Sequence, residues 1–214
     1  MHPAADLDHG RVFCVARTEL LMLQEAKTAM QYLNLIQESM RDRRRYASWF
    51  EGSRREKSAK EVGIVNCLLE SFEEAGSCEY PNLRTSTLDP PDCLANTPDG
   101  ALVGFEVREL VDQEVVELNK RGIAVYRDWT DSDVIDVIET ILQEKDSKNY
   151  IGGPYEKLVL VVHTAESDLT HRELRPVLNS HAFTQTKKLH QVYVLFPYDP
   201  ETKRYPYIQL KTAK

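Results

Sequence analysis

The sequence NTPDG at residues 96–100 constrains the fold of this chain more than any other segment. Proline fixes its own φ angle and glycine accepts a positive φ, so the segment predicts a tight turn between two strands. If the turn is centred near Asp99, antiparallel partners have residue numbers that sum to about 198. Residues 88–109 are therefore predicted to form a β-hairpin in which Asp92 lies opposite Glu106.

The strand that leaves this turn has two different faces, because side chains alternate along a strand. Its core face is predicted to consist of Val103, Phe105 and Val107. On the other face Glu106 and Arg108 join Asp92 in one polar patch. Two carboxylates this close repel each other unless one is protonated, Arg108 neutralises them, or a divalent cation lies between them. Oxygen ligands in a partly open site suit Mg²⁺ or Mn²⁺, whereas the simpler alternative is an exposed hairpin with a surface Glu–Arg pair.

The rest of the chain alternates between helix and strand patterns. Apolar spacing predicts helices at about 15–44, 54–75, 110–120 and 131–145, with Ser53 and Thr130 as N-caps and Gly76 as a stop. Continuous apolar runs predict strands at 157–163 and 191–197, and an edge strand at 205–210. We therefore expect an α/β fold with helices on both sides of a mixed sheet.

The 214 residues suffice for one sizeable domain with an appendage. We expect residues 1–50 to form a tail followed by the long helix, and residues 51–214 to form the main domain. The apolar stripe of the long helix could pack on the main domain, or on a second copy of the chain as a homodimer.

Residues 41–60 are basic, although the formal net charge of the chain is −7. The arginines of interest are Arg43, Arg44, Arg45, Arg54 and Arg55. Aromatic residues at 46–50 lie between them, which is typical of a surface that binds phosphates. The alternative is a solvated helix junction whose arginines pair with local acids. The negative net charge argues against a surface that is adapted to nucleic acid throughout.

The four cysteines show no metal-binding spacing and are expected to be buried, reduced thiols. The N-terminus has no basic-then-apolar signal pattern, and no apolar run approaches the roughly 20 residues that span a bilayer. We therefore expect a cytoplasmic protein with no membrane partner.

The order of these motifs resembles the PD-(D/E)XK nuclease superfamily. The matching pieces are a helix with Glu61, then DPPD at 89–92, then GFEVR at 104–108, followed by a helix. The resemblance covers about residues 54–125 by motif and extends more loosely to the later strands. It looks closest to the small uncharacterised bacterial or phage-associated members. It implies a restriction-endonuclease-like αβββαβ core.

The resemblance also implies a divalent-metal site for Mg²⁺ or Mn²⁺. Asp92 and Glu106 would ligate the ion, and the backbone carbonyl of Val107 would add an oxygen. Glu61 would reach the ion or its water shell from the preceding helix, with Glu56 as the alternative.

Arg108 takes the place of the family lysine, which is the main departure from the pattern. Arginine stays protonated at physiological pH, so it can stabilise charge and hold a phosphate but cannot act as a base. Gln113 falls where some branches carry a polar residue that contacts the substrate.

These observations support two hypotheses and one further idea. The first is a metal-dependent nuclease that hydrolyses phosphodiesters of DNA or RNA. The second is a catalytically inactive binding or assembly module with the nuclease fold, in which Arg108 pairs with Glu106. A host-directed effector or phage-defence component is a third idea that nothing in the sequence separates from the first two.

Overall fold

The computed structural model describes residues 54–212, except residues 77–79, 124, 126–127 and 167. Its strands form one mixed, open sheet in the order β1-β2-β3-β4-β5-β6, which is the order of the sequence. The strands are β1 (Arg84–Thr85), β2 (Cys93–Asn96), β3 (Leu102–Glu109), β4 (Lys157–His163), β5 (Gln191–Leu195) and β6 (Tyr207–Gln209). Strands β3, β4 and β5 are parallel, whereas β1–β2, β2–β3 and β5–β6 pair antiparallel.

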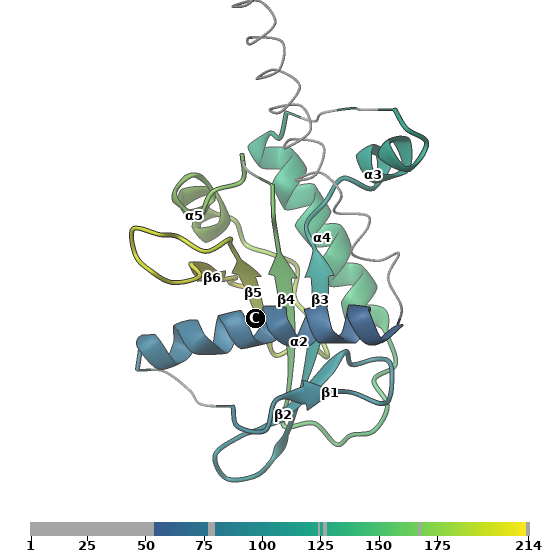
Figure 1. The fold of residues 1–214 in the computed structure, drawn as a ribbon, viewed down its shortest axis with the longest axis vertical. Coiled ribbons are helices and arrows are strands. Elements are labelled where there is room, and N and C mark those ends of the chain that lie inside the picture. The colour runs from purple at the N-terminus through teal and green to yellow at the C-terminus, as the bar shows by residue number, and fades with distance from the viewer. Residues whose placement is uncertain (1–53, 77–79, 124, 126–127, 167, 213–214) are drawn as a thin grey trace, which may run out of the picture. The chain divides into compact units, whose positions relative to one another are not determined.

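The helices are α2 (Arg54–Glu74), α3 (Gln113–Lys120), α4 (Asp131–Ser147) and α5 (His171–Ser180). Of these, α2, α4 and α5 cover the two faces of the sheet, whereas α3 lies apart from it (Figure 1). The apolar side of α2 packs with one face of β2–β5, including Phe105, Val161 and Tyr193. The apolar sides of α4 and α5 pack with the other face of β4 and β5. The parallel strands are thus buried on both faces, which is why 157–163 reads as a continuous apolar run.

The turn at 96–100 produces the predicted hairpin register. Gly100 has a φ of 93°, and its N–H donates to the carbonyl of Thr97 at 2.9 Å. Cys93 pairs with Phe105, and Asn96 pairs with Leu102, so the predicted sum for paired residues is confirmed. The register matters because a slip by one residue would turn every side chain to the opposite face.

Helix boundaries follow local chemistry. Thr130 caps α4 in a capping box: its side chain accepts from the Asp133 N–H, while the Asp133 carboxylate accepts from the Thr130 N–H. Gly76, just after α2, has a φ of 65°, as its role as a helix stop requires. Both signals were correctly interpreted from the sequence.

The structure corrects or leaves open several expectations. The segment 171–180 forms α5, which the sequence reading did not predict, and β5 and β6 are shorter than expected. The tail and long helix at 1–50, including Arg43, Arg44 and Arg45, lie outside the described residues. Arg54 and Arg55 begin α2, but their side chains are not described. In the described part of the chain, no helix is long and apolar enough to cross a bilayer.

Candidate metal centre

Asp92 lies where β2 begins and β3 continues past it. Its N–H donates to the Phe105 carbonyl at 3.0 Å, although the β2–β3 register pairs Phe105 with Cys93, so the ladder is irregular at Asp92. Its carboxylate oxygen Oδ2 accepts the Val107 N–H at 2.8 Å. This side chain therefore satisfies a backbone donor of β3 that has no strand partner at that position, and the hydrogen bond fixes the orientation of the carboxylate.

The loop before Asp92 is seated directly on the sheet because residue 104 is a glycine. A Cβ atom at Gly104 would come within 3.1 Å of Pro91 Cγ and within 2.8 Å of Leu158 Cδ2. Both distances are shorter than ordinary carbon contacts. The absence of a side chain at Gly104 thus lets Pro91 pack against β3 and holds the acid-bearing loop in place.

Glu106 is buried on the opposite face of β3 from Phe105, with only 1% of its surface exposed. The prediction of an open polar patch on this face is wrong in one respect, because helix α4 covers Glu106. Lys145 of α4 forms an ion pair with Glu106 Oε2, and Lys148 Nζ lies 3.4 Å from the same oxygen. The simpler alternative of a surface Glu–Arg pair is therefore wrong.

Three acids meet at this point and are called the acidic cluster below: Asp89, Asp92 and Glu106. One carboxylate oxygen from each lies within 4.8 Å of the others. Asp92 and Glu106 are buried, whereas Asp89 is exposed, so the cluster is open on the Asp89 side. The second oxygen of Glu106, Oε1, is buried and has no hydrogen-bond partner among the described residues. A buried carboxylate oxygen without a donor fits a site for a hard cation.

Glu61 approaches the acidic cluster from α2. It is 8% exposed and pairs with Lys57 Nζ at 3.3 Å. Burial, followed by the repulsion of Asp92, raises the pKa of Glu61 to about 7. Lys57, Glu61, Asp89 and Asp92 share the lining of a small pocket of about 40 Å³. Glu61 was expected to reach the metal ion or its water shell; it shares this pocket with Asp92 but is not one of the three acids whose oxygens lie within 4.8 Å of one another.

Burial, and then neighbouring carboxylates, disfavour negative charge in the cluster. Burial and then Asp92 raise the pKa of Glu106, although Lys145 and Lys148 act in the opposite direction. Burial and then Glu106 raise the pKa of the Tyr150 hydroxyl, which donates to the Lys145 carbonyl at 2.9 Å. Asp92 and Glu106 thus disfavour each other's charge, and a divalent cation between them would relieve this repulsion.

The other residues predicted for the site do not belong to the acidic cluster. Arg108 is half-buried, and within the described residues it forms no ion pair with Glu106; its charge instead acts on Glu109. The N–H and C=O groups of one residue in an extended strand point to the same edge of that strand. The Val107 carbonyl therefore points to the edge of β3 where the Val107 N–H meets Asp92.

Gln113 is exposed at the start of α3. Glu56 lies in α2, but its side chain is not described.

The sequence reading missed Asp89, Lys145 and Lys148. Lys145 carried a detectable signal, because it follows Ile138, Ile141 and Leu142 on the buried stripe of α4. A lysine on an apolar stripe needs a buried acid as a partner. Asp89 is three residues before Asp92 in the DPPD motif. The two intervening prolines do not reveal from sequence alone whether the two acids face each other.

No family model, curated protein or solved structure matches the chain. The functional argument therefore depends on the site itself.

Proposed function

We propose that this protein is a divalent-metal-dependent nuclease with a PD-(D/E)XK-type core. The observation that carries the proposal is the acidic cluster, with the buried and unpartnered Oε1 of Glu106 inside it. The order α2, β1, β2, β3, α4, β4, in which α3 is inserted before α4 and α5, β5 and β6 follow, supports the αβββαβ core that the motifs imply.

The residues that would hold Mg²⁺ or Mn²⁺ are Asp89, Asp92 and Glu106, with the carbonyl of Val107 beside them. When bound, such an ion polarises the phosphoryl oxygen and lowers the pKa of its water. The donor set consists of oxygens only, which is the set that these two ions prefer.

Glu61 is suited to accept a proton from the attacking water. Its raised pKa of about 7 lies near neutral pH, and general bases are most effective when their pKa is near the operating pH. Lys57 holds this carboxylate at 3.3 Å and thereby orients it toward the side of Asp92.

Lysines on both sides of the cluster supply positive charge. Lys57 and Lys148 are 40% and 36% exposed, so each can contact a phosphate from solvent. Lys145 is buried beside Glu106 and provides there the ammonium group that the motif pattern places at residue 108. Arg108 cannot act as a base, and this geometry does not require it to do so.

A second candidate function is a binding or assembly module without turnover. It is favoured by one observation: Lys145 and Lys148 both contact Glu106 Oε2 and so neutralise the carboxylate without a metal. In that case the cluster is a structural ion-pair network, and nucleic acid or a second protein copy is bound without cleavage.

Metal binding and cleavage separate the two functions. Mn²⁺ titration by calorimetry should show one site that Asp92→Asn or Glu106→Gln weakens more than about 100-fold. The same variants should abolish Mg²⁺- or Mn²⁺-dependent nicking of plasmid DNA or cleavage of a single-stranded RNA. The matched control is Asp136→Asn, an exposed acid on α4 that should leave both properties unchanged.

Cleavage that persists in Asp92→Asn or Glu106→Gln would contradict the nuclease proposal. Mn²⁺ binding without any cleavage of DNA or RNA would favour the binding module.

A further inference from the structure

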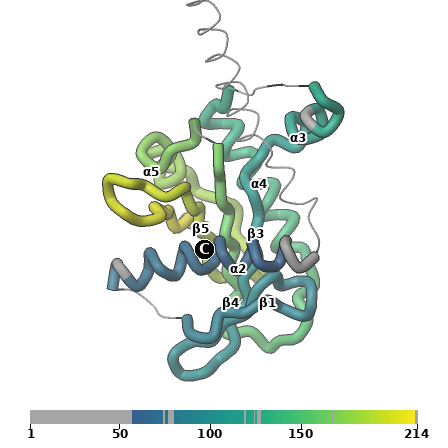
Figure 2. Tube along the Cα trace, viewed as in Figure 1, coloured from purple at the N-terminus to yellow at the C-terminus, as the bar shows by residue number. Residues whose placement is uncertain are grey.

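A second polar pocket lies at the opposite end of α2 from the acidic cluster. It has a volume of about 400 Å³, which is within the usual range for small-ligand sites of about 300–1,000 Å³. Its walls come from the last turns of α2, from α5, and from the segment 199–209 that contains β6. Figure 2 shows α5 and this segment lying together on the side of the sheet reached by the C-terminal end of α2.

Two arginines in the wall form no ion pair and no side-chain hydrogen bond among the described residues, although the charge of Arg204 also acts on Asp199. Arg175 comes from α5, and Arg204 from the segment between β5 and β6. Both side chains are exposed, and neither forms an ion pair or a side-chain hydrogen bond in the part of the chain that the structure describes. These two guanidinium groups place positive charge in one pocket, although the chain as a whole has a net charge of −7.

His171 shows that the two charges converge on the pocket. Its ring is half-buried and packs edge-on against Phe196, with ring centroids 5.4 Å apart. Burial first, and then Arg175 and Arg204, lower the pKa of His171, whereas Asp199 acts in the opposite direction. The imidazole is therefore neutral at neutral pH and retains one N–H donor.

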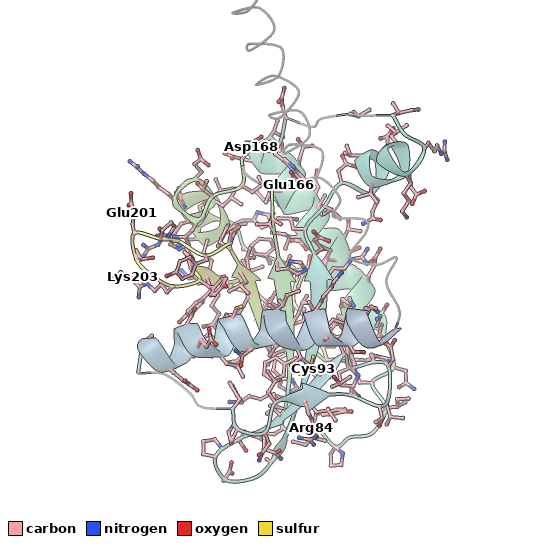
Figure 3. The ribbon with its side chains drawn as sticks, in the orientation of Figure 1. Arg84, Cys93, Glu166, Asp168, Glu201 and Lys203 are labelled. Carbon is pink, nitrogen blue, oxygen red and sulfur yellow. The ribbon has the colours of Figure 1, made fainter. Side chains whose placement is uncertain are left out.

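The acid in the wall does not neutralise both arginines. Asp199 accepts the Glu201 N–H at 2.9 Å and the Thr202 hydroxyl at 2.7 Å, so each carboxylate oxygen already has a donor in its own loop. The neighbouring charged residues Glu201 and Lys203 extend from the outer end of this loop (Figure 3). With one acid and two arginines, the pocket retains a net positive charge.

We propose that this pocket binds a terminal phosphate group through Arg175 and Arg204, with His171 and Asn179 as neutral donors. Arginine forks match the oxygens of a phosphate in pairs, and charge-assisted hydrogen bonds are the strongest that a protein offers an anion. Tyr205 and Tyr207 also line the pocket and provide apolar surface for the group that carries the phosphate. The phosphate comes either from inorganic phosphate or from a nucleoside monophosphate.

The pocket is separate from the acidic cluster. Ser71, in its wall, is ten residues along α2 from Glu61, which corresponds to roughly 15 Å at 1.5 Å per residue. Phosphate binding here involves none of the clustered acids, and it is tested without a metal ion.

The test is calorimetric titration of the full chain in EDTA with inorganic phosphate, adenosine 5′-monophosphate and adenosine. We expect one or both phosphate compounds to bind and adenosine not to bind. Arg175→Ala and Arg204→Ala should each weaken binding by about tenfold or more. The matched control is Arg172→Ala, because Arg172 is exposed on the same helix but does not line the pocket.

The comparison of the two phosphate compounds identifies the source. Tighter binding of the nucleotide assigns the site to a nucleoside monophosphate, whereas equal binding assigns it to phosphate itself. Adenosine binding as tightly as its monophosphate would overturn the proposal. So would the absence of binding by either phosphate compound, or unchanged affinity in an Arg175→Ala/Arg204→Ala double variant whose circular dichroism spectrum matches that of the wild type.

Discussion

The buried ion pair between Lys145 and Glu106 makes the most direct prediction about stability. Lys145→Met removes the ammonium group and keeps most of the volume of the side chain. Glu106 is 1% exposed, so the variant leaves a carboxylate buried beside Asp92 with one of its two cations gone. Breaking a buried pair in this way costs about 3–5 kcal/mol.

The expected cost lies at the lower end of that range. Lys148 remains 3.4 Å from Glu106 Oε2, but its side chain is 36% exposed and is partly screened by water. We expect a loss of about 3 kcal/mol, which corresponds to a decrease in Tm of about 6–12 °C for a domain of roughly 150–250 residues. Urea and thermal unfolding at pH 7.5 in EDTA measure the change.

Two further measurements test the cause. Glu106→Gln in the Lys145→Met background should recover most of the lost stability, because the buried charge is then absent. The matched control is Lys120→Met, which removes the lysine of an exposed pair with Glu117 and should cost less than about 1 kcal/mol. A Lys145→Met variant no less stable than Lys120→Met, or a double variant with no recovery, would refute the reasoning.

Three other predictions follow from single residues. Glu109 is 2% exposed, and burial first and then Glu166 raise its pKa from 4.5 to about 7. The contribution of Glu109 to the free energy of unfolding is thus fully present below pH 4.5 and is lost as the pH rises through 7. Glu109→Gln should stabilise the protein by about 1–3 kcal/mol at pH 8 and by nothing at pH 4, measured by urea unfolding, and equal effects at both pH values would contradict this. Thr130→Ala should cost about 1 kcal/mol by the same measurement, because it removes the α4 capping box, whereas Thr130→Ser should cost little. Arg108→Lys should leave metal-dependent cleavage within about threefold of the wild type, because Lys145 already supplies an ammonium group to Glu106; a loss of about 100-fold would assign Arg108 a direct role in cleavage.

The hairpin shows how far local sequence determines this fold. The NTPDG turn sets the register of β2 and β3, and the register places Asp92 and Glu106 close together. The paired residues are close in the sequence, and their pairing depends on the geometry of the turn and on the alternation of side chains along the strands, which are both local properties. The same is true of the start of α4 at Thr130 and of the β4 run at 157–163.

The partner of Glu106 could not be predicted in the same way. Lys145 is 39 residues away, and its contact with Glu106 depends on how α4 crosses the sheet. That crossing is decided by packing among many apolar side chains, which no local pattern specifies. The nearby Arg108 was therefore the natural choice of cation from sequence, although the structure places two lysines of more distant origin beside the acid.

The hydrogen bond from Val107 to Asp92 makes one backbone amide a reporter of the whole centre. Only one side-chain oxygen, Asp92 Oδ2, accepts this N–H, so its proton chemical shift follows the electron density on that carboxylate. Protonation of the cluster, binding of a cation and loss of an acid would each change the same resolved signal in an amide NMR spectrum. The chain therefore carries, in the Val107 amide of β3, its own spectroscopic probe of the charge state of these acids.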